Sequence, residues 1–273
     1  MDVITSPSNP AVRAARKLAR PSSRARADGR FLLEGPEGIR AALEAGHLPE
    51  SLLVTERAAA RHAGLVNLAR QRGAQVTLVA EPVLSALAAT TTPQGLVAVL
   101  PSVLRPLSDL PGSARLVCVL AEVRDPGNAG TVLRAADAFG ADAVVTTRGS
   151  VDPQSPKAVR AAAGSLFHLP VVAGVPWPEL AAALRERGLR LVGADPHAEA
   201  SVDRAPLGEP VALVLGNEAH GLPDEVAADL DQVVRVPLAG RAESLNLAAA
   251  AAVLLYEAAR QRRGVAEEAT VGR

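Results

Sequence analysis

Residues 116–147 have the sequence LVCVLAEVRDPGNAGTVLRAADAFGADAVVTT. The apolar run at 116–120 predicts a strand, the turn at 124–128 leads into a helix predicted over 130–139, and 143–147 predicts a second strand. This strand–helix–strand order favours a parallel pair in a sheet that helices cover. In such sheets ligands bind at the carboxyl ends of the strands, so we expect a functional site in the turns that follow strands.

The same alternation extends in both directions from this stretch. Downstream it predicts strands over 169–172, 190–193, 211–215 and 233–236, and helices over 156–166, 177–187 and 244–262. Upstream it predicts strands over 30–33, 51–54, 75–79 and 95–99, and helices over 8–20, 35–45, 57–72 and 82–87. We therefore expect an α/β protein with a smaller domain over 1–100, a Pro-, Ser- and Gly-rich linker over 101–113, and a larger parallel-sheet domain over 114–273.

The charges balance in total but are unevenly distributed. The chain has 29 Lys and Arg residues against 29 Asp and Glu residues, yet residues 1–30 carry a net charge of +5 and the remainder carries −5. A basic segment is typical of contact with nucleic-acid phosphates, and a solvated helix face is the alternative. The candidate RNA-binding residues in this segment are Arg13, Arg16, Lys17, Arg20, Arg24 and Arg26.

The composition excludes several classes of protein. With 273 residues, 48% of them hydrophobic, the chain can form one large or two smaller domains with a real core. The one cysteine, Cys118, lies mid-strand and excludes a disulfide framework, and the five histidines lack metal-ligand spacing, so no metal is expected. The N-terminus lacks the features of a secretory signal, and the most apolar stretch, 247–256, is far shorter than the roughly 20 residues of a membrane span. We expect a cytoplasmic protein with no membrane segment.

The first turn after a strand, DPGNAG at 125–130, is suited to an anion. Gly127 and Gly130 let the backbone approach a ligand, and the helix that follows presents unpaired N–H groups. Asn128 is expected to cap this helix, and the Arg134 guanidinium can reach back toward the turn. The alternatives are an ordinary helix cap and an exposed helix arginine.

The second turn runs from Gly216 to Gly221 after the apolar strand 211–215, with Glu218 and His220 between the two glycines. A glycine-bounded turn at a strand end suits an adenosine or amino-acid group that lies against the backbone. It lacks the Gly-x-Gly-x-x-Gly spacing of dinucleotide-binding folds. The alternative is an ordinary turn whose polar residues face solvent.

The third turn, 236–246, leads into an alanine-rich helix for which Ser244 is the predicted N-cap. A helix of small apolar residues is expected to be buried on several faces, either at the centre of the domain or in a subunit interface. Asn246, a polar residue in the first turn of such a helix, needs a hydrogen-bond partner. This requirement favours a functional role for Asn246.

Taken in order, the three turns resemble the motifs of the SpoU/TrmH family of SPOUT methyltransferases. Motif 1, Asn-x-Gly-x-x-x-Arg, corresponds to Asn128, Gly130 and Arg134; motif 2, Gly-x-Glu-x-x-Gly-Leu, to Gly216, Glu218, Gly221 and Leu222; motif 3, Pro-x-x-Gly-x-x-x-Ser-Leu-Asn, to Pro237, Gly240, Ser244, Leu245 and Asn246. The segment 152–167 also resembles the family, although Ala162 stands where a small hydroxyl residue is expected. In the first domain, the stretches 6–10, 31–35 and 92–95 resemble the family's substrate-binding module, which is similar in fold to a ribosomal protein.

The resemblance implies a fold, an activity and a set of site residues. Family members form an α/β domain with a deep trefoil knot, pair as homodimers through it, and transfer a methyl group from S-adenosylmethionine to a ribose 2′-hydroxyl in RNA. The implied cofactor pocket comprises Gly193, Ala194, Leu215, Gly216, Gly221, Val236, Leu238, Leu245 and Ala248. The implied catalytic residue is Arg134, with Asn128, Glu218, Ser244 and Asn246 positioning Arg134 and the ribose.

Two roles are open for Arg134 in that reaction. The family assigns to this arginine the acceptance of the hydroxyl proton, often together with the pocket of the partner subunit. Lowering an arginine pKa from about 12.5 to about 8 costs roughly 6 kcal/mol. A charged arginine that stabilises the developing alkoxide is the less costly alternative.

The RNA substrate also has alternatives. The leading domain favours ribosomal RNA over transfer RNA, and the predicted substrate is 23S ribosomal RNA. A non-catalytic RNA-binding or assembly protein on the same scaffold is a different class, and the intact motifs argue against it. A Rossmann oxidoreductase is disfavoured because its glycine fingerprint is absent.

Overall fold

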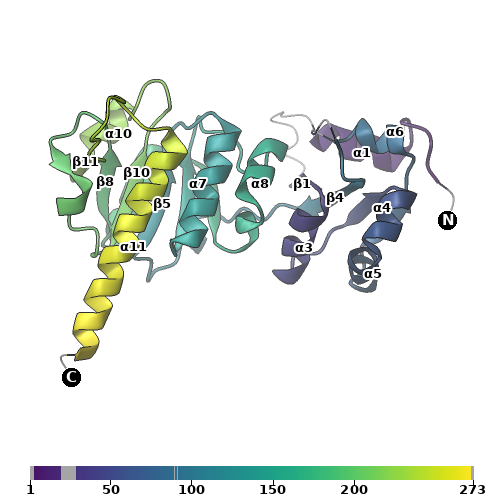
Figure 1. Ribbon diagram of the computed structural model, residues 1–273, viewed down its shortest axis with the longest axis horizontal. Coiled ribbons are helices and arrows are strands. Elements are labelled where there is room, and N and C mark those ends of the chain that lie inside the picture. The colour runs from purple at the N-terminus through teal and green to yellow at the C-terminus, as the bar shows by residue number, and fades with distance from the viewer. Residues whose placement is uncertain (1–2, 20–28, 89, 91, 272–273) are drawn as a thin grey trace. The chain divides into compact units, whose positions relative to one another are not determined.

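The structure is a computed structural model that describes residues 3–19, 29–88, 90 and 92–271. It divides into two units (Figure 1). The first unit comprises Met1–Val103 and Gln154–Phe167, and the second comprises Leu104–Pro153 and His168–Arg273. Each unit has its own sheet and its own apolar core.

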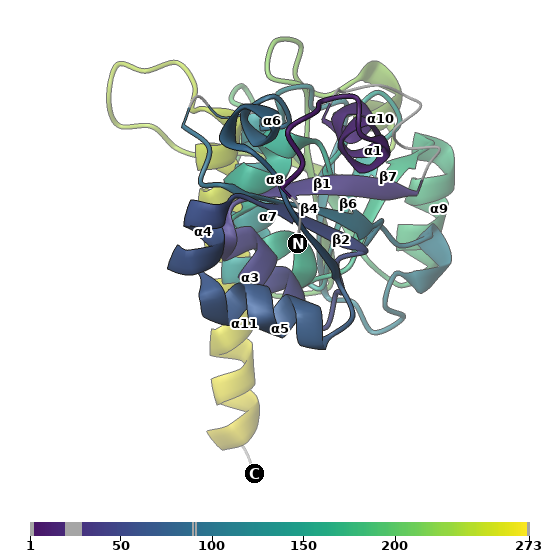
Figure 2. The same ribbon diagram turned by 90° about the vertical axis from the view of Figure 1, so that its right-hand side faces the viewer.

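The first unit is built on a four-stranded sheet of order β1-β4-β2-β3. Its strands are β1 (Arg30–Glu34), β2 (Ser51–Val54), β3 (Gln75–Leu78) and β4 (Leu96–Pro101), and its helices are α1 (Pro10–Leu18), α3 (Pro36–Glu44), α4 (Glu56–Arg61), α5 (Ala63–Gln71), α6 (Glu81–Ser85) and α8 (Pro156–Ala162). Strand β4 is antiparallel to β1 and β2, whereas β2 and β3 are parallel. Helices α1 and α6 lie on one face of this sheet and α3 and α5 on the other (Figure 2).

Helix α1 illustrates how sequence periodicity positions the helices of this unit. Val12, Ala15 and Leu18 recur every third residue, are buried, and join a core with residues of β1, β2 and β4. Asn9 caps the helix, because its Oδ1 accepts a hydrogen bond from the Ala11 N–H (2.9 Å). The charged residues of α1 therefore face away from the sheet.

The helix predicted over 57–72 is two helices, so that prediction was wrong at its centre. Helices α4 and α5 meet at His62, whose φ of −116° and ψ of 35° lie outside the helical region. The His62 N–H still donates to the Ala58 carbonyl (2.9 Å). Hydrophobic periodicity does not register a break of a single residue, because the apolar spacing continues across it.

The segment 154–167 belongs to the first unit, although the sequence assigned it to the second domain. It contains α8 and a 3₁₀ turn, Ser165–Phe167. The Phe167 ring lies 6.3 Å from that of Phe31 and 5.4 Å from that of His47, and Arg160 forms an ion pair with Glu34 (3.5 Å). These partners are more than a hundred residues away in the chain, which is why local pattern did not reveal them.

The second unit is a parallel α/β sheet, as predicted. Its seven strands have the order β7-β6-β5-β10-β8-β11-β9, and every neighbouring pair is parallel. They are β5 (Leu116–Leu120), β6 (Ala143–Thr147), β7 (Val171–Val175), β8 (Arg190–Ala194), β9 (Ala200–Ser201), β10 (Val211–Leu215) and β11 (Gln232–Arg235). The helices are α7 (Pro126–Ala138), α9 (Trp177–Glu186), α10 (Asp224–Ala228) and α11 (Leu247–Val271). The knot implied by the resemblance stays a prediction.

Both faces of this sheet are covered. Trp177 and Leu180 of α9 and Val226 of α10 pack in one core with Val117 and Val119 of β5. Because strand side chains alternate between faces, the other β5 residues point to the opposite face, where α7 and α11 lie together (Figure 1). Within the described part of the chain, no helix combines the length and apolar character needed to cross a membrane.

The predicted linker over 101–113 divides between the two units. Pro101 ends β4, whereas Leu110 is buried in the core of the second unit. The Arg105 N–H donates to the Val171 carbonyl (2.8 Å), and the Arg187 side chain donates to the Leu110 carbonyl (3.3 Å). Most of this Pro-rich stretch is therefore ordered against the parallel sheet.

Candidate functional site

Four strands of the second unit bring their carboxyl ends to one edge of the sheet. Strands β5, β10, β8 and β11 are neighbours in that order and run parallel. A cavity of about 560 Å³ lies at this edge, lined by the turns that follow β8, β10 and β11 and by the start of α11. Its volume falls within the range of about 300–1,000 Å³ that is usual for small-molecule sites.

Helix α7 begins at Pro126, earlier than the sequence predicted. Its N-cap is Asp125, whose Oδ1 accepts a hydrogen bond from the Asn128 N–H (2.8 Å). The prediction that Asn128 caps this helix was therefore wrong, because a proline at the first helical position moves the cap to the residue before it. Asn128 lies in the first turn, and its side chain makes contacts outside the helix.

Glu218 accepts hydrogen bonds from the start of α7. Its Oε2 accepts from the Arg124 N–H (3.3 Å), and its Oε1 accepts from the Asp125 N–H (3.2 Å) and from Asn128 Nδ2 (3.1 Å). Partial burial raises the pKa of Glu218, but the hydrogen bonds from backbone N–H groups and from Asn128 outweigh burial and hold the pKa below its ordinary value of 4.5. At neutral pH Glu218 is therefore an ionised acceptor and does not donate a proton.

Asn246 joins motif 3 to motif 1. Its Nδ2 donates to Asn128 Oδ1 (3.1 Å), and its Oδ1 accepts from the Ala248 N–H (2.9 Å) and the Ala249 N–H (3.4 Å). Asn246 is thus the N-cap of α11, and the prediction that Ser244 caps this helix was wrong because the helix starts only at Leu247. The partner that Asn246 was expected to need is Asn128.

The three motifs therefore share one chain of hydrogen bonds. Because the Glu218 carboxylate can only accept, Asn128 directs its Nδ2 toward Glu218 and leaves its Oδ1 to accept from Asn246. Ser244 lines the same cavity as these three residues. The orientation of each amide is thus fixed by the ionised carboxylate at one end of the chain.

The turn after β10 needs glycine at both ends. A Cβ at Gly216 would lie 2.3 Å from the carbonyl carbon of Gly221, so a side chain there would require the backbone to move. Gly221 has a φ of +69°, in the left-handed region that favours glycine. Backbone hydrogen bonds between Asn217 and Gly221 (2.7 and 2.9 Å) close the turn.

Most of the predicted cofactor residues line the cavity. The residues that do so are Ala194, Leu215, Gly216, Gly221, Val236, Leu238 and Leu245. Gly193 lies inside β8, where a Cβ would meet Leu230 Cδ1 at 2.3 Å, and Ala248 is buried in the first turn of α11. Neither Gly193 nor Ala248 is among the described residues that line the cavity, and the cofactor role of the whole set stays a prediction.

Arg134 lies apart from the other predicted catalytic residues. It is exposed on α7, six residues beyond Asn128, which corresponds to about 9 Å along the helix axis. It is not among the described residues that line the cavity of its own chain. The structure thus brings Asn128, Glu218, Ser244 and Asn246 together, whereas Arg134 lies further along α7, the helix that carries Asn128 in its first turn.

Sequence reasoning missed several polar residues of this cavity. Asp195 and His197 follow β8, and the Asp195 Oδ1 accepts from the His197 N–H (2.7 Å) to close that turn. Asn217 follows β10 and is buried. All three lie directly after parallel strands, where ligands bind, so their position was the available signal.

The single cysteine is not among the described residues that line the cavity. Cys118 is fully buried in β5, and burial raises the pKa of its thiol to about 12. A thiol that stays protonated at neutral pH is not a nucleophile. Among the described residues, no group of three or more His, Cys, Asp and Glu side chains could hold a metal ion.

The basic leading segment is only partly described. Arg13, Arg16 and Lys17 are exposed on α1, on the face opposite its buried stripe. Arg20, Arg24 and Arg26 lie outside the described residues. The structure therefore tests neither the RNA-binding role nor the solvated-face alternative.

Comparison with known proteins decides the family. The model of the SpoU rRNA Methylase family matches residues 115–256, and that of the MRM3-like substrate binding domain matches residues 9–98. The chain belongs to the SpoU rRNA methylase family. This assignment confirms the predicted family and the methyltransferase class.

Individual relatives are similar to this chain in sequence or structure over most of its length. The 23S rRNA (guanosine(2553)-2'-O)-methyltransferase RlmP of Bacillus subtilis is 35% identical over 226 residues, which cover 83% of this chain and 87% of RlmP. The crystal structure of an AdoMet-bound rRNA methyltransferase from Sinorhizobium meliloti has a TM-score of 0.84 at 32% identity, covering 95% of this chain and 97% of that one. The SpoU methyltransferase AviRb from Streptomyces viridochromogenes, in complex with AdoMet, also has a TM-score of 0.84, at 30% identity, covering 94% of this chain and 100% of AviRb.

Proposed function

We propose that this protein transfers a methyl group from S-adenosylmethionine to a ribose 2′-hydroxyl in RNA, with 23S ribosomal RNA as the substrate. The observation that carries the proposal is the hydrogen-bonded chain of Glu218, Asn128 and Asn246, which joins all three family motifs beside one cavity. Three relatives support the choice of RNA, because each is named as a 23S rRNA 2'-O-methyltransferase. They are RlmP, a uridine(2479) methyltransferase of Streptomyces viridochromogenes, and RlmB of Bordetella pertussis.

The cavity fits S-adenosylmethionine in size and in character. The Gly216–Gly221 turn, Val236 and Leu238 line the side of the cavity against which we place the adenosine, and the glycine at 216 allows the turn to close on Gly221. Leu215, Leu245 and Leu254 add apolar surface around it. When bound, S-adenosylmethionine supplies an electrophilic methyl group on a sulfonium.

The residues of the chain orient the groups that react. Direct displacement at carbon requires the hydroxyl oxygen to lie in line with the methyl group, so fixed geometry contributes much of the rate. Asn128 and Asn246 are held in one orientation by the ionised Glu218, and Ser244 adds a hydroxyl at the same cavity. We assign to these residues the binding and alignment of the ribose.

Arg134 is assigned the stabilisation of the developing alkoxide as a charged group, because converting an arginine to its neutral form near neutral pH costs roughly 6 kcal/mol. The hydroxyl proton then passes to solvent water as the bond between the ribose oxygen and the methyl carbon forms and the bond between that carbon and sulfur breaks. Its place outside the cavity of its own chain favours action on the cavity of a second subunit. The exposed apolar side chains near the cavity and on α11 support such a subunit contact: Leu238, Leu245, Val253 and Tyr256 are each between 37% and 49% exposed. We assign these residues to a homodimer interface.

The dimer is tested by charge substitution. Val253→Glu combined with Tyr256→Glu is expected to convert the protein to a monomer in sedimentation velocity, because charged residues are not tolerated at the core of an interface. Leu48→Glu is the matched control, since Leu48 is a large apolar residue of the first unit that is 45% exposed. A dimer that survives the double substitution would exclude this interface.

The activity is tested with radiolabelled S-adenosylmethionine and unmodified RNA transcripts. We expect label at one ribose of a 23S rRNA transcript, mapped as a 2′-O-methyl group, and no label on transfer RNA. Label on transfer RNA alone would replace the proposed substrate with the alternative one. Calorimetry that finds RNA binding without cofactor binding would instead identify a non-catalytic RNA-binding protein.

A further inference from the structure

The backbone at Glu122 adopts an unfavourable conformation directly after β5. Glu122 has a φ of +54°, one of two described non-glycine residues with positive φ. L-residues with a side chain rarely adopt this left-handed region, and such strain clusters at functional sites. The residue lies between the end of β5 and the motif 1 turn, so its conformation sets the direction in which that turn leaves the sheet.

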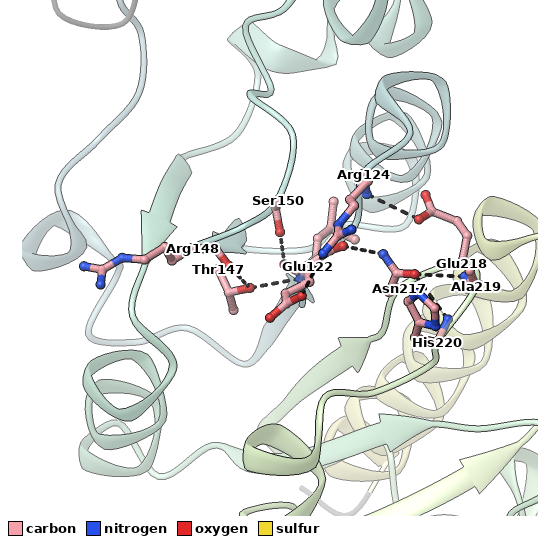
Figure 3. Close-up of polar contacts among 10 residues, drawn as sticks. Glu122, Arg124, Thr147, Arg148, Ser150, Asn217, Glu218, Ala219 and His220 are labelled. Atoms are coloured by element: carbon pink, nitrogen blue, oxygen red, sulfur yellow. Dashed lines mark hydrogen bonds and ion pairs between the residues drawn. The ribbon is translucent and has the colours of Figure 1, made fainter. Parts of the chain in front are cut away.

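Two side chains from neighbouring strand ends hold the Glu122 backbone (Figure 3). The Glu122 N–H donates to Thr147 Oγ1 (3.0 Å), at the end of β6. The Glu122 carbonyl accepts from Asn217 Nδ2 (2.8 Å), directly after β10. The backbone polar groups of the strained residue are thus bound from both sides of β5.

The Asn217 side-chain oxygen binds the backbone of the Gly216–Gly221 turn, which we call the cofactor turn. Its Oδ1 accepts from the Ala219 N–H (2.9 Å) and the His220 N–H (3.2 Å). One amide group therefore stabilises the turn that lines the cavity and also donates to the Glu122 carbonyl. Asn217 is 9% exposed, and both its donor and its acceptor are in use. The next residue, Glu218, accepts hydrogen bonds from the Arg124 N–H (Figure 3) and from the Asp125 N–H of the same segment.

We infer that Asn217 is a positioning residue for methyl transfer, which fixes the motif 1 turn relative to the cofactor turn by holding Glu122 in the left-handed conformation. The inference rests on the proposed function, because the step that it serves is the alignment of ribose and methyl group. Asn217 acts through Glu122. The backbone conformation of Glu122 determines the position at which α7 begins, and hence the position of Asn128. Small displacements of this kind, about 1 Å, are sufficient to slow a reaction about 100-fold.

The test substitution is Asn217→Asp. Aspartate keeps an oxygen to accept from Ala219 and His220, but it places a second oxygen where Nδ2 donated to the Glu122 carbonyl. With saturating S-adenosylmethionine and RNA, the single-turnover rate is expected to fall at least about 10-fold, while the calorimetric Kd for S-adenosylmethionine changes less than about 3-fold.

Thr147→Val provides a second, uncharged variant. It removes the acceptor for the Glu122 N–H from the opposite side, at a residue that is not among the described residues lining the cavity. For this variant too, we expect the single-turnover rate to fall while the Kd for S-adenosylmethionine stays nearly unchanged. Ser150→Ala is the matched control, because the Ser150 hydroxyl donates to the Leu120 carbonyl (3.0 Å) and not to Glu122; its rate is expected to match that of the unsubstituted protein.

Hydrogen exchange supplies a readout that does not depend on activity. In Asn217→Asp the amide hydrogens of Glu122, Arg124 and Asp125 are expected to exchange faster, with those of β5 unchanged. An unchanged rate with unchanged exchange, or a rate loss matched by an equal loss of cofactor affinity, would overturn the inference. If the unsubstituted protein methylates no RNA, the proposed function fails, and the exchange result alone then decides whether Asn217 holds the turn.

Discussion

At the scale of single residues, Glu218 is the group on which the orientation of the others depends. It is ionised because three donors from the motif 1 segment bind its two oxygens. The carboxylate therefore binds the Asn128 Nδ2 group, which leaves the Asn128 Oδ1 to accept a hydrogen bond from Asn246. A protonated or neutral side chain at this position would remove that directing effect without changing the size of the group.

The lowered pKa of Glu218 makes a prediction about stability and pH. A carboxyl whose pKa is lower in the folded than in the unfolded protein stabilises the fold above its unfolded pKa, near 4.5, and loses this contribution as pH falls through the folded pKa. Glu218→Gln is therefore expected to lower the urea midpoint at pH 7. The difference from the unsubstituted protein should shrink steadily below pH 4.5. A difference that stays constant from pH 7 to pH 3 would contradict an ionised Glu218.

Gly216 makes a second prediction at this scale. Gly216→Ala places a Cβ 2.3 Å from the Gly221 backbone, so the turn must open and the cavity wall must shift. We expect the Kd for S-adenosylmethionine to rise at least about 10-fold and the free energy of unfolding to fall by about 1–3 kcal/mol. Gly112→Ala is the matched control, since a Cβ there would meet no atom within 4 Å. Equal cofactor affinity in both variants would show that the turn does not contact the cofactor.

At the scale of elements, sequence pattern located the strands better than the ends of the helices. The strands predicted at 51–54, 116–120, 143–147 and 211–215 have the observed bounds, because an apolar run bounded by polar residues is a local signal. The starts of α7 and α11 were missed, because the cap is chosen by which side chain reaches the free N–H groups, and Asp125 and Asn246 do so in place of Asn128 and Ser244.

Sequence pattern reports local signals only, and this also explains which residues of the site could be predicted. Motif positions identified residues that line the cavity, but Asn217 and Glu122 were not among them. Their importance comes from a hydrogen bond across 95 positions of sequence and from a positive φ, neither of which has a local signature. Contacts between distant strand ends have to be seen in the fold.

Helix α1 carries the prediction that belongs to this scale. Substituting Gln for Arg13, Arg16 and Lys17 removes three cations from an exposed face while leaving the buried stripe intact. If this face binds RNA, the affinity for RNA should fall and the slope of log Kd against log salt should flatten by about 2, with cofactor affinity unchanged. Filter binding at several salt concentrations measures both quantities. An unchanged slope would leave α1 as a solvated helix face.

At the scale of the whole molecule, the position of Arg134 bears on how many chains make one active site. Arg134 is exposed on α7, the cavity of its own chain is lined by other described residues, and exposed apolar side chains lie at the cavity and on α11. The ring of Tyr256 on α11 also contacts that of Phe139 at the end of α7, at 5.7 Å. We propose that a homodimer through this surface places Arg134 of one chain at the cavity of the other.

Mixing two impaired variants, at an S-adenosylmethionine concentration well below the raised Kd of Gly216→Ala, distinguishes an active site shared between chains from one within a chain. Arg134→Ala keeps its cavity but lacks the arginine, whereas Gly216→Ala keeps the arginine but has a damaged cavity. If Arg134 serves the partner's cavity, a heterodimer of the two has one complete site, and co-expression in equal amounts should restore about a quarter of the unsubstituted activity. If Arg134 acts within its own chain, no combination has a complete site and the mixture is no more active than the two variants assayed separately. Full activity of Arg134→Ala by itself would instead remove Arg134 from the catalytic residues.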